Sequence, residues 1–167
     1  MGRVKNNSGF TIVELMMVVL IIAVLAAVAV PNMVPMIDLI KLRTGADGIK
    51  RQMIAARTRA LSDPNTHVGV YINQSVTPNT SFIFLDVGGT ADQYDAGTDK
   101  IYMGIHSVPK GIWDSIPTVG NGGVTNNAVV FRGDGSAKTG GSVIVKNRFG
   151  KIRIVNVLAS TGRVKVQ

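Results

Sequence analysis

The hydrophobic and polar positions divide the chain into an apolar N-terminal segment and a longer part of mixed polarity. From Leu15 to Val30 no side chain is polar, and together with Phe10 to Val13 this run is interrupted only by Thr11 and Glu14. As an α-helix the whole segment would measure roughly 31 Å, about the hydrocarbon thickness of a bilayer. The pattern predicts a membrane-spanning helix over residues 10–30 with one carboxylate near its start.

Helical periodicity continues after this segment. Pro31 and Pro35 each lack an amide donor and crowd the preceding turn, so we expect a kink at Pro31 or a short melted stretch there. Beyond them, apolar side chains recur every three or four residues at Ile49, Met53, Ala56 and Ala60. Asp63-Pro64-Asn65 is a stop signal. The sequence therefore predicts one long bent helix from about Phe10 to Leu61, amphipathic over residues 31–62.

The remainder, residues 63–167, has the pattern of a β-rich domain. Short runs of β-branched and aromatic residues predict strands at 67–72, 81–85, 101–105, 128–131, 142–146, 151–158 and 163–166. Residues 148–150 and 160–162 are typical of hairpin turns, and residues 110–127 of a loop. The fold class is α+β, with the second half of the helix packed on an antiparallel sheet.

The apolar N-terminal segment allows two general interpretations. It is a secretory signal cleaved after Ala27-Val28-Ala29, or a signal anchor held by Arg3 and Lys5 at the cytoplasmic side. Against cleavage after Ala29, the segment is longer than the usual 7–15 residues of a signal peptide. A carboxylate in such a segment costs on the order of 3 kcal/mol at mid-bilayer, which suggests that Glu14 has a partner.

A third interpretation comes from resemblance. The stretch Gly9-Phe10-Thr11-Ile12-Val13-Glu14-Leu15 resembles the class III leader junction of type IV pilins and type II secretion pseudopilins. The resemblance implies that a prepilin peptidase removes residues 1–9, a cytoplasmic leader, by cutting between Gly9 and Phe10. It also implies that the new amine of Phe10 is N-methylated and that Glu14 faces the Phe10 amine of a neighbouring subunit in a filament.

The same resemblance implies a cellular location and a function. Residues 10–30 would span the inner membrane once, residues 31–62 would continue the helix, and residues 63–167 would form a periplasmic domain. The chain would be a structural subunit whose partners are other pilins or pseudopilins, in a type II secretion pseudopilus or a type IV pilus. A minor rather than a major subunit is expected.

The C-terminal third narrows the resemblance. Val129-Val130-Phe131-Arg132-Gly133-Asp134-Gly135 and the closing Gly162-Arg163-Val164-Lys165-Val166 are similar to the GspH/FimT group of minor pilins and pseudopilins. Some FimT-like members bind DNA for uptake through a terminal Gly-Arg-x-Arg motif. Here lysine stands at the second basic place, which keeps a point charge but loses the bidentate fork of arginine.

Charge is consistent with this alternative function. The chain has a net charge of +8, and between Arg132 and Gln167 one acid accompanies eight cations: Arg132, Lys138, Lys146, Arg148, Lys151, Arg153, Arg163 and Lys165. A basic face binds phosphates with little sequence preference, although it also simply keeps a domain soluble. Our candidates for DNA or another polyanion are Lys151, Arg153, Arg163 and Lys165. They share one face if Ala159 pairs with Arg163, and a one-residue change of register separates them.

The sequence does not indicate an enzyme. The chain contains no cysteine, so thiolate chemistry and cysteine-based metal sites are excluded. His67 and His106 are isolated, and Gly133-Asp134-Gly135 is better explained as a turn than as a phosphate loop. Asp92, Asp95 and Asp99 share a loop of the kind that some pseudopilins use for calcium, but their spacing does not match an EF-hand. We expect no catalytic residue, no metal and no cofactor.

Overall fold

The computed structural model describes residues 9–76, 78–89, 93–115, 127–138 and 140–167. It divides at Ile37 into an N-terminal part and a folded domain, Asp38–Gln167, and each is described by itself. Helix α1 (Ile12–Ser62) contributes to both. Because its buried side chains begin at Asp38, the hydrophobic core belongs wholly to the folded domain.

Within the domain, α1 buries one stripe of small and apolar side chains. Ile49, Met53, Ala56 and Ala60 are all fully buried, which confirms the predicted stripe. The stripe begins earlier than the sequence suggested, at Leu42 and Ala46. The helix ends at Ser62, directly before the Asp63-Pro64-Asn65 stop signal. There the carboxylate of Asp63 accepts hydrogen bonds from the N–H of Asn65 and the hydroxyl of Thr66.

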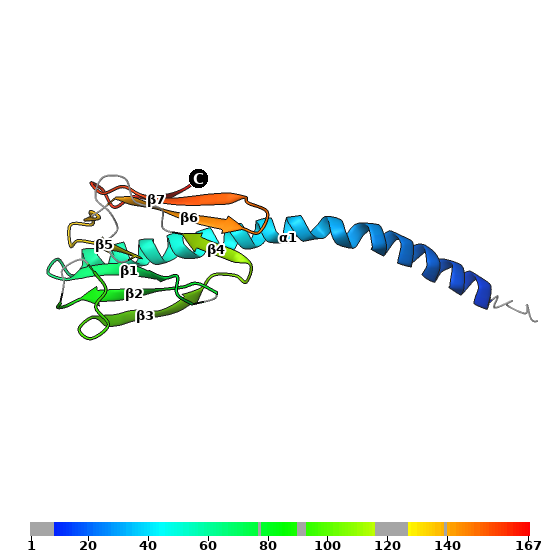
Figure 1. Ribbon diagram of the computed structural model, residues 1–167, viewed down its shortest axis with the longest axis horizontal. Coiled ribbons are helices and arrows are strands. Elements are labelled where there is room, and N and C mark those ends of the chain that lie inside the picture. The colour runs from blue at the N-terminus through cyan, green and yellow to red at the C-terminus, as the bar shows by residue number, and fades with distance from the viewer. Residues whose placement is uncertain (1–8, 77, 90–92, 116–126, 139) are drawn as a thin grey trace, which may run out of the picture. The chain divides into compact units, whose positions relative to one another are not determined.

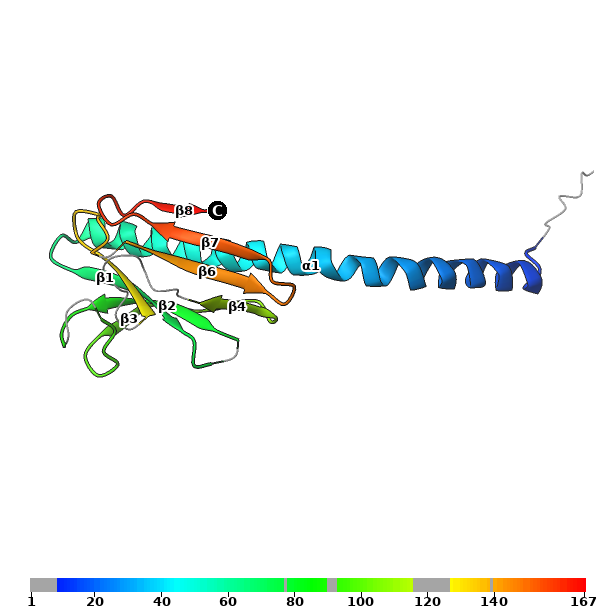
Figure 2. The same ribbon diagram turned by 45° about the horizontal axis from the view of Figure 1, so that its top comes forward.

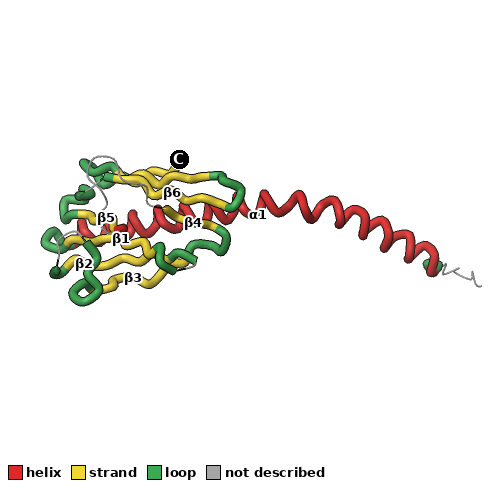
Figure 3. The backbone as a smooth tube through the Cα atoms, viewed as in Figure 1, coloured by secondary structure: helices red, strands yellow, loops and turns green. Residues whose placement is uncertain are grey.

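The strands confirm the α+β class and form two antiparallel sheets (Figure 1). The first sheet has the order β3-β2-β1-β5, built from β1 (His67–Asn73), β2 (Thr80–Asp86), β3 (Lys100–Ser107) and β5 (Ala128–Phe131). The second has the order β4-β6-β7-β8, built from β4 (Ile112–Ser115), β6 (Gly141–Asn147), β7 (Ile152–Val157) and β8 (Val164–Val166). Figure 3 shows both sheets in yellow beside the red helix.

Strand β4 corrects one prediction. The sequence suggested a loop over residues 110–127, but Ile112–Ser115 pairs with β6 in an antiparallel register. Residues 116–126 of that predicted loop lie outside the described residues. Strand β4 is short and its sequence has no clear strand pattern, so its pairing with β6 determines its extended conformation.

One core joins the helix and the inner faces of both sheets. Alternate residues of β1 and β5 face the helix from the first sheet, and alternate valines of β6 and β7 face it from the second; they include Val68, Val70, Ile72, Val129, Phe131, Val143, Val145, Val155 and Val157. Figure 2 shows β6, β7 and β8 along one side of the helix and β1 to β3 along another. Gln52 adds a polar link, donating to the carbonyl of Ser81 at 3.1 Å.

The far face of the first sheet has an aromatic cluster. Tyr94, from the loop between β2 and β3, packs its ring against Tyr71, Phe82 and Phe84 at centroid distances of 4.9 to 5.2 Å. These contacts bury an outer face that would otherwise expose large apolar rings. The four rings thus have a packing role within the domain.

Candidate functional site

The N-terminal part of α1 is apolar and uncovered. Ile12–Val30 is 19 residues long, has a mean hydropathy of 3.0 and has none of its side chains buried. By length and composition this segment can cross a membrane. A helix that is apolar all round needs lipid or other helices about it.

Thr11 and Glu14 form a capping box at the start of α1. The carboxylate Oε2 of Glu14 accepts hydrogen bonds from the backbone N–H of Thr11 at 2.9 Å and from its hydroxyl at 3.0 Å. In return the hydroxyl of Thr11 accepts the N–H of Glu14 at 3.2 Å. The sequence signal is Thr-x-x-Glu before an apolar run, and our sequence analysis missed it. Glu14 therefore has a local partner within its own chain.

The helix is continuous through Pro31 and Pro35. The short melted stretch that we considered is therefore not present in the secondary structure. A kink at Pro31 remains a prediction. Both prolines belong to the N-terminal part of the chain.

The C-terminal hairpin adopts the register that separates the predicted basic residues. Asn156 pairs with Lys165 and Val157 with Val164, and Leu158 rather than Ala159 is opposite Arg163. Directly opposed residues lie on the same face of a sheet, so Lys165 shares the outer face with Asn156. Successive side chains of β7 point to opposite faces of the sheet. Arg153 is three residues from Asn156, so it faces the other way, inward with Val155 and Val157.

Part of the predicted basic set lies on the outer face of the second sheet. Lys165 on β8 and Lys146 on β6 are exposed on this face, and β7 lies between them. Arg163, which precedes β8, and Lys151, in the turn before β7, are also exposed. The structure therefore places Lys165 on the same outer face as Lys146, a residue outside our predicted set, although their rows lie four residues apart along β7. Arg153 lies on the opposite face.

The glycine of the terminal Gly-Arg motif has a packing role. Gly162 has a positive φ of 59°, and a Cβ at this position would lie 2.0 Å from the carbonyl oxygen of Gly135. That same carbonyl accepts a hydrogen bond from Nε of Arg57 on α1, at 3.0 Å. The turn before Arg163 is thus fixed against the helix and the Gly133–Gly135 turn, which leaves Arg163 itself exposed.

The loop carboxylates and the two histidines do not form a metal site in the described part of the chain. Asp99 instead orders its own loop, since its carboxylate accepts the N–H groups of Val87 and Asp95. Asp92 lies outside the described residues. His67 lies 4.0 Å from the carboxylate of Asp86, and His106 packs against Gly48 of α1. Burial, followed by the nearby charge of Asp99, raises the pKa of the Asp86 carboxyl.

Comparison with known proteins gives one match to the N-terminal segment and several matches to the fold. Residues 4–30 match the family described as the prokaryotic N-terminal methylation motif. The fold is similar to the crystal structure of the type IV minor pilin FimU of Pseudomonas aeruginosa PAO1, with a TM-score of 0.55 and 14% identity, over 75% of this chain and 87% of that one.

It is also similar to the minor pseudopilin EpsH from the type 2 secretion system of Vibrio cholerae. The TM-score is 0.56 and the identity 10%, over 76% of this chain and 96% of that one. A search of curated proteins found no match. At such identities the structural likeness establishes the fold, and function has to be argued from the chain's own residues.

Proposed function

The chain is type IV pilin-like, and from this premise we propose that it is a structural subunit that enters a filament from the inner membrane. The observation that carries the proposal is the complete exposure of the apolar segment Ile12–Val30. Lipid covers this segment before assembly, and the corresponding helices of other subunits cover it in the filament. The folded domain stays outside the membrane as the displayed part of the subunit.

Processing creates the assembling end. A prepilin peptidase cuts between Gly9 and Phe10 on the cytoplasmic side, and the amine of Phe10 is then methylated. Residues 10–30 remain as the membrane span, residues 31–62 continue the helix, with the kink at Pro31, and residues 63–167 form the extracytoplasmic β-rich part. The matched methylation motif supports this scheme because it includes both sides of the junction.

Glu14 pairs with the Phe10 amine of a neighbouring subunit. Both hydrogen bonds from Thr11 reach Oε2, so the capping box leaves Oε1 free to accept from another chain. A cation from an adjacent helix offsets the cost of a carboxylate in lipid. The capping box thus uses one carboxylate oxygen and leaves the other for an intersubunit contact.

The test is incorporation of the subunit into filaments. In the native host, the mature chain should begin at Phe10 and carry one added methyl group by mass spectrometry. Glu14→Ala should still reach the membrane but should be absent from sheared and purified filaments. A chain that begins after Ala29, or a Glu14→Ala variant that enters filaments as well as wild type, would overturn the proposal.

The subunit serves a type II secretion pseudopilus or a type IV pilus, and co-purified partners distinguish these machines. DNA binding is the alternative function. The exposed cations Lys146, Arg163 and Lys165 support it, whereas the inward position of Arg153 reduces the size of the basic surface. We therefore favour assembly as the main function.

A further inference from the structure

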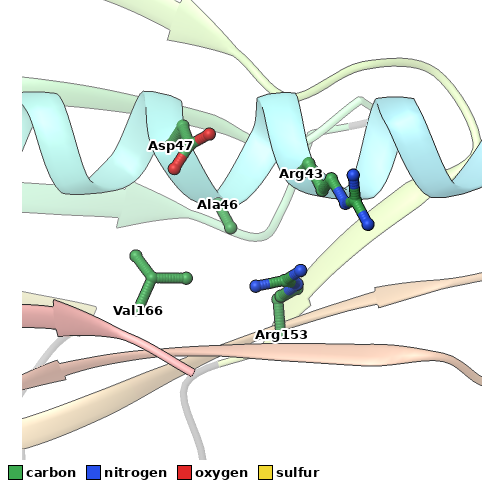
Figure 4. A pocket seen from close by; sticks show the side chains of 5 residues that line it. All are labelled: Arg43, Ala46, Asp47, Arg153 and Val166. Carbon is green, nitrogen blue, oxygen red and sulfur yellow. The ribbon is translucent and has the colours of Figure 1, made fainter.

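A small pocket lies between α1 and the inner side of the second sheet. Its volume is about 270 Å³, and it is lined by Arg43, Ala46, Asp47, Arg153 and Val166. Figure 4 shows these side chains, three from the helix, one from β7 and one from β8. The pocket is separate from the apolar segment and from the outer basic face.

Two arginines enter this pocket from different elements. Arg43 extends from the helix and Arg153 from β7, and their guanidinium groups approach the same space in Figure 4. Arg153 is half-buried among valines, which is an unusual position for a cation on the inner face of a strand. Within the described part of the chain neither guanidinium has an ion pair or hydrogen bond, whereas Arg57 and Arg148 on neighbouring surfaces both do.

The charges in the pocket do not balance. Asp47 is the one carboxylate among the lining residues, it lies one helical turn from Arg43, and it forms no ion pair within 4.0 Å in the described structure. One acid and two arginines among the lining residues leave an excess of one positive charge. Like charges that face each other repel, and an anion placed between them removes that repulsion.

The chemistry of the pocket fits a carboxylate. A guanidinium presents a planar fork of N–H donors that matches the two oxygens of a carboxylate. Ala46 and Val166 contribute apolar walls, which reduce competition from water for those donors. The volume admits one small group and not an extended chain of phosphates, and Asp47 further disfavours a polyanion.

We propose that this pocket binds a single carboxylate, the side chain of an Asp or Glu that projects from a neighbouring subunit of the filament. The proposal rests on the assembly function argued above. It assigns to Arg43 and Arg153 an intersubunit contact made by the folded domain, distinct from the contact of Glu14. Arg153, first considered for DNA, here serves protein recognition.

The first experiment measures carboxylate binding by the full chain in detergent micelles. Acetate is titrated, with inorganic phosphate in parallel, and the Nε–H signals of the arginines are followed by NMR. Acetate should shift Arg43 and Arg153 together along one saturable curve. Arg153→Gln should abolish the shift of Arg43. Arg153→Lys, which keeps the charge but loses the fork, should weaken binding about threefold or more.

Arg51→Gln is the matched control, because Arg51 is an exposed arginine on the same helix outside the pocket. This variant should bind acetate as wild type does. Equal shifts at Arg51 and Arg43, a linear response without saturation, or tighter binding of phosphate than of acetate would overturn the carboxylate assignment.

The second experiment tests the source of the carboxylate in filaments. The chain has no cysteine, so Val166→Cys at the pocket wall provides a unique thiol and leaves both arginines in place. A thiol reagent that bears a hydrazide is attached there, and a carbodiimide activates the bound carboxylate so that the hydrazide forms an amide-type bond with it and the activated oxygen leaves as the urea. A cross-link to an Asp or Glu of another subunit, lost in a Glu14→Ala strain that lacks filaments, is the expected result. An absent cross-link in normally assembled filaments would overturn the pocket proposal alone, whereas normal assembly of Glu14→Ala would overturn the assembly function.

Discussion

Arg148 donates a hydrogen bond from Nε to the buried carboxylate of Asp38, which connects the β6–β7 turn to the first helical residue of the folded domain. The two side chains differ in their environment. Asp38 is 6% exposed, whereas Arg148 is 51% exposed and also lies over the ring of Phe149. The acid therefore depends on the arginine for its hydrogen bond far more than the arginine depends on the acid.

This asymmetry predicts unequal effects of the two substitutions. Arg148→Ala leaves a buried carboxylate without its cation and should lower the free energy of unfolding by about 3 kcal/mol. Asp38→Asn leaves an arginine that can turn to solvent, and should cost about 1 kcal/mol. Chemical denaturation of both variants measures the difference. Equal losses would show that the pair is not organised around the buried acid.

Gly48 permits a close contact between α1 and β3. A Cβ at Gly48 would lie 2.2 Å from Nε2 of His106, so the ring occupies the space that a side chain would need. Alanine normally stabilises a helix by about 1 kcal/mol relative to glycine. We nevertheless expect Gly48→Ala to lower the free energy of unfolding by about 1 to 2 kcal/mol, because the overlap exceeds this gain.

Gly45 provides the matched control for Gly48. A Cβ there would meet its nearest neighbour, a side-chain atom of Val108, at 3.4 Å. Gly45→Ala should therefore be neutral or slightly stabilising, and adding His106→Ala to Gly48→Ala should recover most of the loss. Thermal denaturation of these three variants beside wild type tests this explanation, which fails if both glycines respond alike.

A substitution of Thr11 distinguishes the helix-capping role of Glu14 from its proposed pairing with a neighbouring amine. If pairing with a neighbouring amine is the main role, Thr11→Ala should reduce filament incorporation about fivefold at most, since only a helix cap of about 1 kcal/mol is lost. Glu14→Ala should abolish incorporation. The amount of each variant in purified filaments is the measurement. Equal defects in the two variants would assign Glu14 to capping alone.

The outer face of the second sheet predicts which cations contact DNA, if DNA binds. Combined substitution of Arg163 and Lys165 by alanine should weaken binding and lower the slope of log K against log salt by about two. Arg153→Gln should have little effect, because that side chain faces inward. Gel shifts at several salt concentrations measure both slopes. A larger loss from Arg153→Gln would contradict this assignment.

The Gly133–Gly135 turn predicts a pH effect. The hydroxyl and the backbone N–H of Ser136 donate to the carboxylate of Asp134 at 2.6 and 2.8 Å, and they hold the pKa of that carboxyl below its usual value. The unfolded chain therefore binds the proton more readily, so this stabilisation is present above about pH 4 and is lost as the pH falls further. The difference in Tm between wild type and Asp134→Asn should be largest near neutral pH and should disappear in acid. A difference that is constant with pH would exclude this origin.

Local patterns predicted the elements that depend on local physics. The helical stripe follows from the spacing of Ile49, Met53, Ala56 and Ala60, and the strand over residues 128–131 was predicted with the bounds that the structure has. The hydrophobic pattern therefore predicted most of the strands and their order along the chain. Their division between two sheets was not, because strand partners are set by contacts between distant residues.

The basic residues show where local patterns stop being sufficient. The sequence indicates that Arg163 and Lys165 alternate on one face of a strand, but not which face of β7 they join. The turn at Gly162, with its positive φ and its contact with Gly135, decides that question. The convergence of Arg43 and Arg153 likewise depends on how a helix and a distant strand pack, which no local pattern contains.

The uncovered segment Ile12–Val30 also bears on why the N-terminal part of the chain matches a family by sequence, whereas the folded domain is similar to other proteins mainly in structure. Under the function proposed above, the side chains of that segment contact lipid or neighbouring helices, so their identity is constrained by molecules outside the chain. The core of the folded domain is constrained only by itself, and many sequences satisfy the same packing. A short motif is therefore enough to assign the class of the protein, whereas its individual specialisation lies in surface features of the domain such as the pocket between Arg43 and Arg153.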